Sequence, residues 1–344
     1  MKIDNFNFDL PETLVAKKLC NPRDGARMAV LNRKNNEIVD DYFYNIINYF
    51  EEGDLFVINN TKVFPCVLRG RKENGGLIEI KLGSRKDEYI WDCIVESARE
   101  LKTGEKLFFG DNNEIIANVI ERNSFDTGYL MKFDSETNIE EQIEKIGSYF
   151  FPIYLPQKID NPEDYQTIYA SEWGSMQPPV AGMHFTDELF KKAKDKNINV
   201  CNITLHIGRL DKLALQNGKM EIEEHKMYKE HYILDDDTAK LINKTKENGK
   251  RIVAIGTTAV RTLESIADEK GYVHGGEGWT DLYIYPGYKF KIIDALLSNL
   301  QPPMTTNLML ACAFGGREQV MNLYEHAVRD NYKFLEYGDC ALYI

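Results

Sequence analysis

The chain has 344 residues, of which 43% are hydrophobic, and its 54 acidic and 42 basic residues give a formal net charge of −12. This length and apolar content can build a substantial core, favour two domains over one, and argue against a disordered chain. The negative charge excludes a protein that coats nucleic acid nonspecifically, so any contact with RNA must be a local patch.

Targeting segments and cysteine clusters are not found in the sequence. The N-terminal stretch MKIDNFNFDLPETLV lacks the apolar core of a signal peptide, and no later run approaches the ~18 apolar residues that span a bilayer. We therefore expect a cytoplasmic protein that does not bind a membrane. The six cysteines include no C-x-x-C pair, so we expect neither a zinc site nor a disulfide framework.

Short strands are predicted for the first part of the chain. Residues 26–43 contain two apolar segments around a polar centre at 33–36, which predicts a β-hairpin, and residues 53–59 predict a further strand. Between 63 and 134, strand-like segments alternate with Gly, Asn and Asp clusters, as in a small barrel or sandwich. A short helix is predicted over 139–146.

The second half of the chain has the alternating rhythm of an α/β domain. A connection at 148–186, rich in proline and aromatic residues, precedes it and is typical in length of a functional loop. Helices are predicted at 187–197, 236–250, 258–270 and 316–330, and strands at 198–208, 251–256 and 341–344. The predicted fold is therefore mixed α/β. A main α/β domain with a barrel-like sheet (1–62 and 148–344) is interrupted by an inserted all-β, barrel-like domain (63–147).

The segment RIVAIGTTAVRTLE predicts a buried strand that ends at Gly256 and a helix that begins with Thr257 and Thr258. The N–H groups of a helix's first turn are unpaired and carry partial positive charge, so they can hold a carboxylate or a phosphate. Arg261 follows one turn later. The alternative is an ordinary strand-to-helix turn capped by threonine.

The segment VAGMHFT combines groups that can bind and react. Its glycine permits close approach of a ligand, and His184 could exchange a proton near neutral pH just before a helix that its threonine caps. The alternative is a structural histidine held by hydrogen bonds. The residues of this segment expected to bind the substrate are Gly182, Met183, Phe185 and Thr186.

The segment TLHIG lies at the end of a predicted strand. Ligands of α/β sheets bind beyond the carboxyl ends of strands, which is where His206 and Gly208 are expected to lie, with Gly208 in contact with the substrate. Gly256 and Thr257 end another strand in the same way. The two strand ends could therefore converge on one pocket.

The tail EYGDCALYI holds a further candidate group. Asp339 could orient a substrate amine or sulfonium, and Tyr337 could offer its ring face to a cation. A plain Asx turn is the alternative for this tail.

Basic residues cluster in and around the predicted β insert. Arg69, Arg71 and Lys72, with Lys81 nearby, are the best candidates for a local RNA-binding patch. The alternative is that they are solvated residues on strand edges.

Six motifs, in this order, resemble those of the S-adenosylmethionine:tRNA ribosyltransferase-isomerase family. They are NPRDGARMAVLNR, GDLFVINNTKVFPCVLRGRK, DYQTIYASEWGSMQPPVAGMHFT, ITLHIG, AIGTTAVRTLES and EYGDCALYI, and they extend over nearly the whole chain. Any one of them is weak evidence, whereas six at fitting intervals are specific. Asn59 and Thr61, in the second motif, are expected on this resemblance to bind the substrate.

The resemblance implies an unusual group transfer. The family moves the ribosyl portion of S-adenosylmethionine onto the aminomethyl group of a 7-deazaguanine base in tRNA, giving epoxyqueuosine with release of adenine and methionine. S-adenosylmethionine is the substrate, and no metal or redox cofactor is expected. The implied catalytic residues are His184, His206, Arg261 and Asp339. Of these, Arg261 would hold an anion together with Gly256, Thr257 and Thr258, and Asp339 would face the cation together with Tyr337.

Four segments depart from the family pattern, and they leave alternatives open. They are RLDKLALQNGK after ITLHIG, SNLQPPMTTNLML, HKMYKEH and PPVAGMHF. One alternative is a diverged paralogue that uses S-adenosylmethionine with a different or non-tRNA acceptor. Another is a noncatalytic module that binds RNA or a nucleoside. The expected partners are therefore S-adenosylmethionine and either a tRNA anticodon arm or a smaller deazaguanine-type acceptor, with the protein a monomer or a homodimer.

Overall fold

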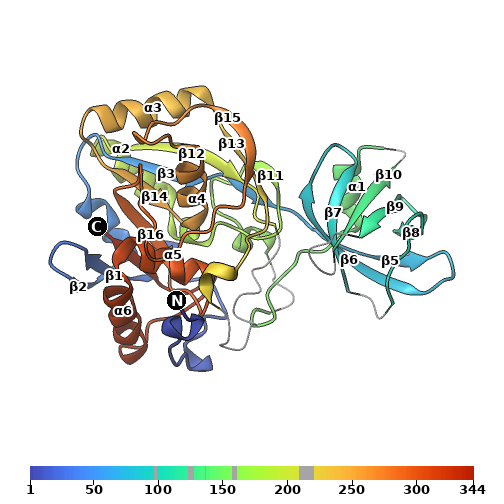
Figure 1. Ribbon diagram of the computed structural model, residues 1–344, viewed down its shortest axis with the longest axis horizontal. Coiled ribbons are helices and arrows are strands. Elements are labelled where there is room, and N and C mark those ends of the chain that lie inside the picture. The colour runs from blue at the N-terminus through green and yellow to red at the C-terminus, as the bar shows by residue number, and fades with distance from the viewer. Residues whose placement is uncertain (97–98, 123–127, 136, 157–160, 209–220) are drawn as a thin grey trace.

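The computed structural model describes the whole chain except residues 97–98, 123–127, 136, 157–160 and 209–220. The described chain forms two lobes, a larger one around a long sheet and a smaller barrel (Figure 1). The barrel strands follow β4 (Thr61–Val63), and the helix α1 (Ile139–Ile146) comes after them in the chain. Back in the larger lobe, β11 (Glu172–Ser175) pairs in parallel with β4.

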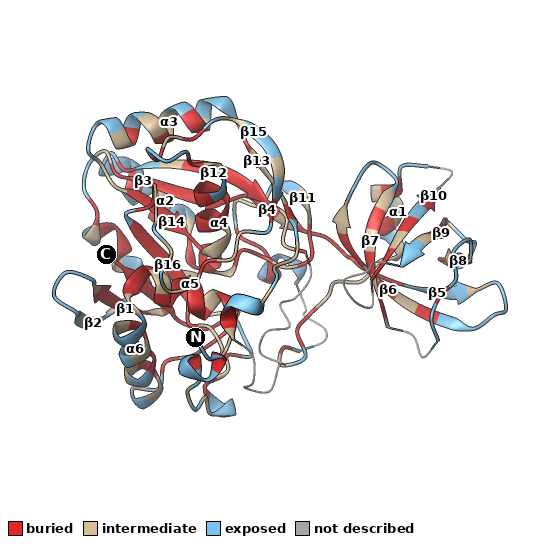
Figure 2. Cartoon of the chain, in the orientation of Figure 1, coloured by how far each residue is buried: buried red, intermediate tan, exposed pale blue. Residues whose placement is uncertain are grey.

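The larger lobe holds a nine-stranded sheet whose four neighbouring strands β12, β3, β14 and β16 run parallel. Across the sheet, the strands are β15 (Gly276–Thr280), β13 (Glu230–Leu234), β12 (Asn199–Leu205), β3 (Leu55–Asn59), β14 (Ile252–Ile255), β16 (Ala295–Asn299), β17 (Cys340–Tyr343), β1 (Arg27–Asn32) and β2 (Glu37–Tyr42). The strands β3, β14 and β16 are buried along their whole length (Figure 2). Such strands read as continuous apolar runs because both faces of the sheet are covered.

Helices and 3₁₀ turns cover the two faces of this sheet. One face packs against α3 (Asp236–Glu247), α4 (Thr257–Ile266), α5 (Thr306–Gly315) and α6 (Arg317–Arg329). The other packs against α2 (Asp187–Asp195) and the 3₁₀ turns Phe43–Tyr49 and Val180–His184. Successive residues of a strand point to opposite faces, so Val57 lies in the first core and Phe56 in the second.

The smaller lobe is a closed antiparallel barrel with its own core. In order around the barrel, its strands are β10 (Gly128–Asp134), β7 (Ile90–Glu96), β6 (Leu77–Arg85), β5 (Val67–Lys72), β8 (Lys106–Phe109) and β9 (Ile115–Arg122). From α1, Ile139 and Ile143 join the buried Trp91 in this core. The helix starts at Asn138, whose side chain accepts a hydrogen bond from the Glu140 N–H at 2.8 Å.

The structure confirms the mixed α/β class and the closed inserted barrel. The predicted hairpin is the antiparallel pair β1 and β2, and the helix expected at 139–146 is α1. The helix expected at 258–270 begins one residue earlier and already ends at Ile266. The strands β15 and β2 are the two outermost strands in the order of the main sheet. The domain boundaries at 63 and 147 stay a prediction. None of the described helices has the length and the apolar run that a membrane crossing needs.

Asp54 joins the starts of two neighbouring central strands. Its side chain is only 2% exposed, and its two oxygens accept hydrogen bonds from the Arg251 backbone N–H at 2.9 Å and from Arg251 Nη2 at 2.7 Å. The guanidinium of Arg251 also lies over the ring of Phe50, 4.9 Å from its centroid. Because Asp54 precedes β3 and Arg251 precedes β14, this ion pair holds the two strands in register where they begin.

Replacing Asp54 by asparagine should destabilise the protein. The variant Asp54→Asn would remove the charge that accepts hydrogen bonds from Arg251, whose side chain is 34% exposed, so the free energy of unfolding should fall by about 2 kcal/mol. Urea unfolding followed by far-ultraviolet circular dichroism measures this change. Asp237→Asn is the matched control, because Asp237 pairs with Lys240 at the exposed surface of α3, where an ion pair contributes little. Equal effects of the two variants would contradict the role given to Asp54.

Candidate active site

The carboxyl ends of four parallel strands lie at one edge of the main sheet. Because β12, β3, β14 and β16 are neighbours and parallel, the segments that follow them emerge side by side. A cavity of about 450 Å³ lies at this edge, and Ile207, Gly256 and Asn299 contribute to its wall from three of these strand ends. This is the place where α/β sheets bind their ligands.

The cavity brings together the segments that the sequence analysis singled out. Ala181 comes from the segment of His184, Ile207 from the segment of His206, and Thr258 from the start of α4. The predicted residues that line the cavity themselves are Gly256, Thr257, Thr258 and Arg261. The other predicted substrate residues lie behind the wall or away from it.

Two helices begin at this cavity. Gly256, with φ of 90°, precedes α4, and no side chain caps the first turn of that helix. The start of α5 also contributes to the wall through Thr305 and Thr306, and the Thr305 hydroxyl accepts a hydrogen bond from the Leu308 N–H at 3.4 Å. Two helix N-termini on one cavity favour a ligand that carries a negative group there.

Arg261 lines the cavity, but its charge already has a buried partner. Its Nη1 forms an ion pair with Glu230, and both side chains are 8% exposed. Its Nε donates to the Leu282 carbonyl at 3.0 Å, while the other oxygen of Glu230 accepts from the Gly208 N–H at 3.1 Å. Arg261 therefore fixes the arrangement of α4, β13 and the loop after β12.

His184 is buried behind the cavity wall. Its Nε2 lies 3.0 Å from Asn299 Oδ1, and the amide nitrogen of Asn299 donates to the carbonyls of Leu335 at 2.9 Å and of Glu336 at 3.2 Å. Because the amide nitrogen is used as a donor, the oxygen of Asn299 accepts, and the proton of a neutral His184 lies on Nε2. Burial lowers the pKa of His184 to about 4, so its ring is neutral at pH 7.

His206 lies beside the cavity wall, next to a second histidine. Its Nδ1 is 2.8 Å from the Thr61 hydroxyl, and its ring stacks on His231 with 6.2 Å between the centroids. Burial, and then the nearby His231, lower the pKa of His206 to about 4. His206 is therefore uncharged near neutral pH and is held in one orientation by Thr61.

Asn59 connects three of the elements that surround the cavity. Its Nδ2 donates to the Leu205 carbonyl at 3.0 Å and to the Thr258 hydroxyl at 3.1 Å. Its Oδ1 accepts from the N–H groups of Leu205 at 3.0 Å and of Thr61 at 3.1 Å. Asn59, predicted to bind the substrate, thus positions the start of α4 through its hydrogen bond to Thr258.

Gly182 is needed for packing. A Cβ atom at this position would lie 1.8 Å from the hydroxyl of Tyr169, so only glycine fits. Met183 and Phe185 are completely buried, and Thr186 caps α2 by accepting a hydrogen bond from the Leu189 N–H at 3.3 Å. None of these four residues, which are predicted to contact the substrate, belongs to the described wall of the cavity.

The tail places Asp339 away from the cavity. Its two oxygens accept hydrogen bonds from the N–H groups of Arg27 and Lys333, each at 2.7 Å. Tyr337 is buried in a small core with Met183 and Tyr165. Neither residue belongs to the described cavity wall, so a role facing the substrate cation stays a prediction for both.

Tyr154 and Glu336 also line the cavity, although no local sequence pattern indicates this. The Tyr154 hydroxyl donates a hydrogen bond to Oε1 of Glu336, and burial raises the pKa of the Glu336 carboxyl. Glu336 directly precedes the tyrosine of the motif EYGD, but a glutamate in a turn has no local signal for binding. Its partner, Tyr154, is 182 residues away in the chain.

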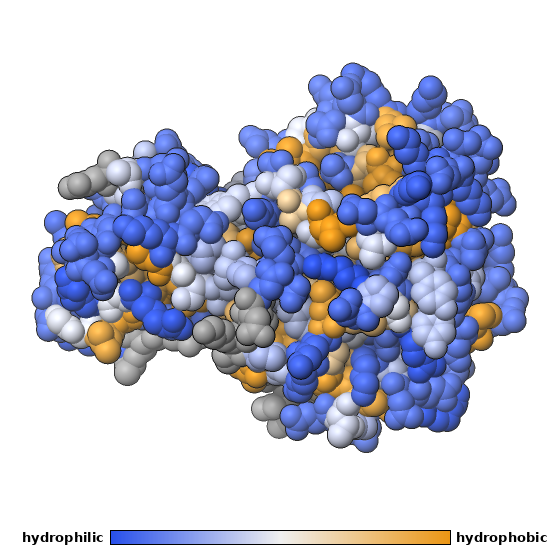
Figure 3. All heavy atoms as spheres, turned by 180° about the vertical axis from the view of Figure 1, so that it is seen from behind, coloured by the Kyte–Doolittle hydropathy of each residue, from blue (hydrophilic) through white to orange (hydrophobic). Residues whose placement is uncertain are grey.

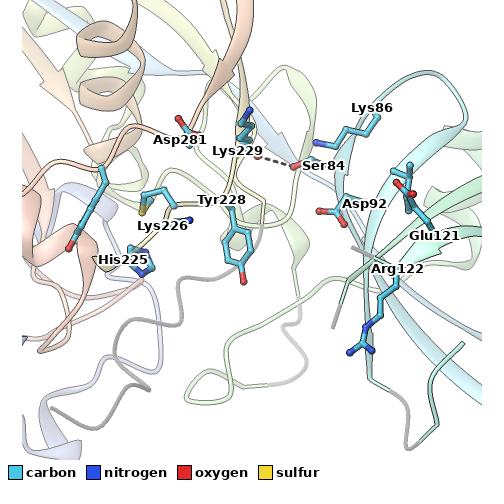
Figure 4. Close-up of a pocket in the computed structure, with 13 residues that line it drawn as sticks. Ser84, Lys86, Asp92, Glu121, Arg122, His225, Lys226, Tyr228, Lys229 and Asp281 are labelled. Atoms are coloured by element: carbon cyan, nitrogen blue, oxygen red, sulfur yellow. Dashed lines mark hydrogen bonds between the residues drawn. The ribbon is translucent and has the colours of Figure 1, made fainter. Parts of the chain in front are cut away.

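A second, larger cavity of about 680 Å³ lies between the two lobes. Figure 4 shows Lys86, Asp92 and Arg122 on the barrel side and, opposite them, Tyr228 and Lys229 on the main lobe. The residues that line both cavities are His225, Met227 and Tyr228. The cleft between the lobes therefore adjoins the cavity at the sheet edge.

The surface around the lobes is mostly hydrophilic on the face shown in Figure 3. The predicted RNA patch lies on the barrel, outside the described walls of both cavities. There Arg69 pairs with Glu79 at 2.8 Å, and Arg71 donates to Asn113 at 2.7 Å. An RNA-binding role for Arg69, Arg71 and Lys72, with Lys81, stays a prediction.

One group of side chains in the described chain has the composition of a metal site. Asp40, His326 and Asp330 bring their ligand atoms within 4.8 Å of one another near the surface. However, Arg329 Nη2 lies 2.8 Å from His326 Nδ1, and Arg27 Nη2 lies 3.9 Å from Asp40. Two guanidinium groups already balance these carboxylates, so the arrangement is that of an ion-pair network.

The departures from the family pattern can be located in part. Residues of HKMYKEH and of SNLQPPMTTNLML line the cavity, including His225 and Thr305. The segment RLDKLALQNGK lies outside the described residues, at 209–219. The departures that can be located are therefore at the candidate site.

Comparisons with known proteins agree with this architecture. The family model described as a queuosine biosynthesis protein matches residues 3–343. A protein of Thermoanaerobacter sp. strain X514 is 42% identical over the full length of both chains. One of Fusobacterium nucleatum subsp. nucleatum is 40% identical over 98% of this chain and 95% of its own. Both relatives are named S-adenosylmethionine:tRNA ribosyltransferase-isomerase.

A solved structure extends the likeness to the whole fold. The crystal structure of S-adenosylmethionine tRNA ribosyltransferase from Thermotoga maritima is similar to this chain with a TM-score of 0.56 and 33% identity, covering 99% of this chain and 100% of that one. The match to the family model and the full-length identity of the relatives exceed what a shared fold alone produces. This chain therefore belongs to the S-adenosylmethionine:tRNA ribosyltransferase-isomerase family of queuosine biosynthesis enzymes.

Proposed function

We propose that this enzyme transfers and isomerises the ribosyl portion of S-adenosylmethionine onto 7-aminomethyl-7-deazaguanine in tRNA. The products are epoxyqueuosine in tRNA, adenine and methionine. One observation carries the proposal: the cavity at the sheet edge, with two helix N-termini and the side chains of Glu230 and Glu336, adjoins a cleft between the lobes. A small charged substrate and a large acceptor can thus meet at one place.

The cavity suits the methionine part of S-adenosylmethionine. Its carboxylate would lie at the uncapped start of α4, near Gly256 and Thr257, where helix N–H groups and the helix dipole favour a negative charge. The aromatic rings of Phe150 and Tyr154 on the same wall can face a sulfonium. The sulfonium acidifies the neighbouring 5′ carbon, so loss of a proton there can start the departure of adenine.

The cleft suits the acceptor. It carries four basic side chains, from Lys86, Arg122, Lys226 and Lys229, and three acidic ones, from Asp92, Glu121 and Asp281. Such a mixed surface allows a local phosphate contact within an acidic protein. Tyr228 points into the space between the lobes and can stack on an unpaired base (Figure 4). An anticodon arm in this cleft would bring its base to the cavity through the wall shared at His225 and Met227.

The predicted roles of His184, His206 and Arg261 remain proposals, and we propose that these residues position other groups of the site. His184 and His206 would act from behind the wall, as neutral groups that hold Asn299 and Thr61 in place. Arg261 would position the start of α4 through Glu230. We propose that the enzyme acts in the cytoplasm, where tRNA is modified, as a monomer or a homodimer.

Incubation of the protein with S-adenosylmethionine and tRNA that carries the aminomethyl base tests the function. The tRNA should gain the mass of the rearranged ribosyl group, and adenine and methionine should appear in equal amounts. Digestion and mass spectrometry measure these products. A gain on the free base but not on tRNA would establish a small acceptor. Binding of S-adenosylmethionine without release of adenine under either condition would establish a noncatalytic module.

Arg261 and Glu230 should depend on each other. Arg261→Met leaves the buried carboxylate of Glu230 without a cation, so the free energy of unfolding should fall by about 3 to 5 kcal/mol. The double variant Arg261→Met/Glu230→Gln should lose less than the sum of the two single variants, because neither charge is then left alone. Urea unfolding of the four proteins gives the coupling energy. Simple additivity would mean that the pair does not position α4.

The stability of the protein should fall on mild acidification because of His184. The folded ring binds a proton only near pH 4, whereas the unfolded ring does so below about 6.5, so the unfolded state binds more protons between these values. Lowering the pH from 7 to 5 should therefore cost the wild type about 2 kcal/mol more than His184→Gln, whose amide can still donate to Asn299. Urea unfolding at both pH values measures this difference. An equal loss in both proteins would contradict the burial of a neutral His184.

A further inference from the structure

Glu336 lines the cavity, and one oxygen of its carboxyl group has no hydrogen-bond partner among the described residues. The Tyr154 hydroxyl donates to Oε1, whereas Oε2 is buried and has no hydrogen-bond partner among the described residues. A buried carboxylate oxygen without a donor is costly, so native proteins seldom leave one without a reason. A bound group that takes up this oxygen would remove the cost.

The backbone holds Glu336 firmly in place. Asn299, at the end of β16, donates to the carbonyls of Leu335 and Glu336, and the Leu335 N–H donates to the Leu300 carbonyl at 3.0 Å. Leu335 has a φ of 75°, a conformation that non-glycine residues rarely adopt. Strained backbone of this kind clusters at active sites and ligand-binding sites.

The charges around the cavity are balanced except at this carboxyl. Arg261, the cation of the wall, is paired with Glu230. Within the described chain, the ion pairs found do not include Glu336. The cavity therefore offers a negative group at Glu336 and positive helix ends at α4 and α5. That is the complement of a ligand that carries both an anion and a cation.

We infer that Glu336 is the residue that recognises the positive sulfonium of S-adenosylmethionine, with Tyr154 orienting its carboxylate. The inference rests on the proposed function, since it takes S-adenosylmethionine as the ligand of the cavity. In this arrangement the carboxylate of Glu336 lies next to the sulfonium, while the methionine carboxylate lies at the helix ends. The assignment moves this role from Asp339, whose oxygens are occupied by backbone N–H groups, to its neighbour in the same turn.

The groups around Glu336 determine how its charge responds to pH. Burial raises its pKa, and the hydrogen bond from Tyr154 opposes that rise. Tyr165 and Tyr337 also face the carboxylate, whose charge contributes to raising the pKa of both phenols. The remaining charged groups of the wall are Arg261, Glu230 and, when protonated, His225. Glu336 is therefore more easily protonated than an exposed glutamate, and a bound sulfonium favours its charged form.

The test compares two ligands that differ in this charge and in the methyl group on sulfur that creates it. S-adenosylmethionine carries the sulfonium, and S-adenosylhomocysteine has a neutral sulfur with the same carboxylate and nucleoside. Calorimetry should show that wild type binds S-adenosylmethionine more tightly. Glu336→Gln keeps the shape of the side chain and removes its charge, so affinity for S-adenosylmethionine should fall about tenfold or more. Affinity for S-adenosylhomocysteine should change less than about twofold.

Two further variants make the result specific. Glu325→Gln removes an exposed carboxylate on α6, outside the described cavity wall, and should leave both affinities unchanged. Tyr154→Phe removes the hydrogen bond that favours the charged carboxylate, so the pKa of Glu336 should rise. The preference of this variant for S-adenosylmethionine should then be lost at a higher pH than in wild type. In Glu336→Gln the ratio of the two affinities should not change with pH.

Each outcome decides between the proposals. Equal loss of both affinities in Glu336→Gln would mean a structural role and overturn the inference, as would a preference for the sulfonium that survives the substitution. Wild type that binds both ligands equally would also overturn it, while leaving the transfer reaction intact. Wild type that binds neither ligand would overturn the proposed function together with the inference.

Discussion

The parallel pairing of β12, β3, β14 and β16 is the constraint on which the site depends. Parallel strands end at the same edge, so segments far apart in the chain meet there, as Asn59 meets Leu205 and Thr258. Helices that follow two of these strands present their N-termini to the same cavity. The positive potential of the cavity is thus a property of the backbone, which side-chain substitutions alter little. Side chains supply what the backbone cannot, a negative charge and polar groups of fixed direction.

Asn299 shows how those directions are fixed. One amide accepts from His184 and donates to the backbone around Glu336, so three segments far apart in sequence share a single support. Asn59 does the same for β12 and α4. The buried histidines are neutral because burial lowers their pKa values, and they act in this network as hydrogen-bonding groups. Such supports hold a reacting group within a narrow range of positions.

Local patterns predicted much of the fold and part of the site. The apolar run that ends at Gly256 and the two threonines after it predicted both the start of α4 and its place on the cavity, because the signal lies within one turn of helix. The pairing of Arg261 with Glu230 and of Tyr154 with Glu336 could not be predicted, since each joins residues brought together only by the fold. In the tail, Asp339 and Glu336 are equally acidic in sequence. The fold distinguishes them, because backbone N–H groups occupy the oxygens of Asp339 whereas Glu336 lines the cavity.

The ion pair between Asp54 and Arg251 lies at the opposite edge of the sheet from the cavity. The ion pair therefore stabilises the sheet where the strands begin, and the site lies where they end. Different residues serve these two purposes. Loops at the carboxyl ends of the strands can change in length and composition while the strands keep their alignment. The segments 225–231 and 298–310, which depart from the family pattern, contribute residues to the cavity at that end of the strands. A scaffold divided in this way can acquire a new acceptor through its loops without having to be restabilised.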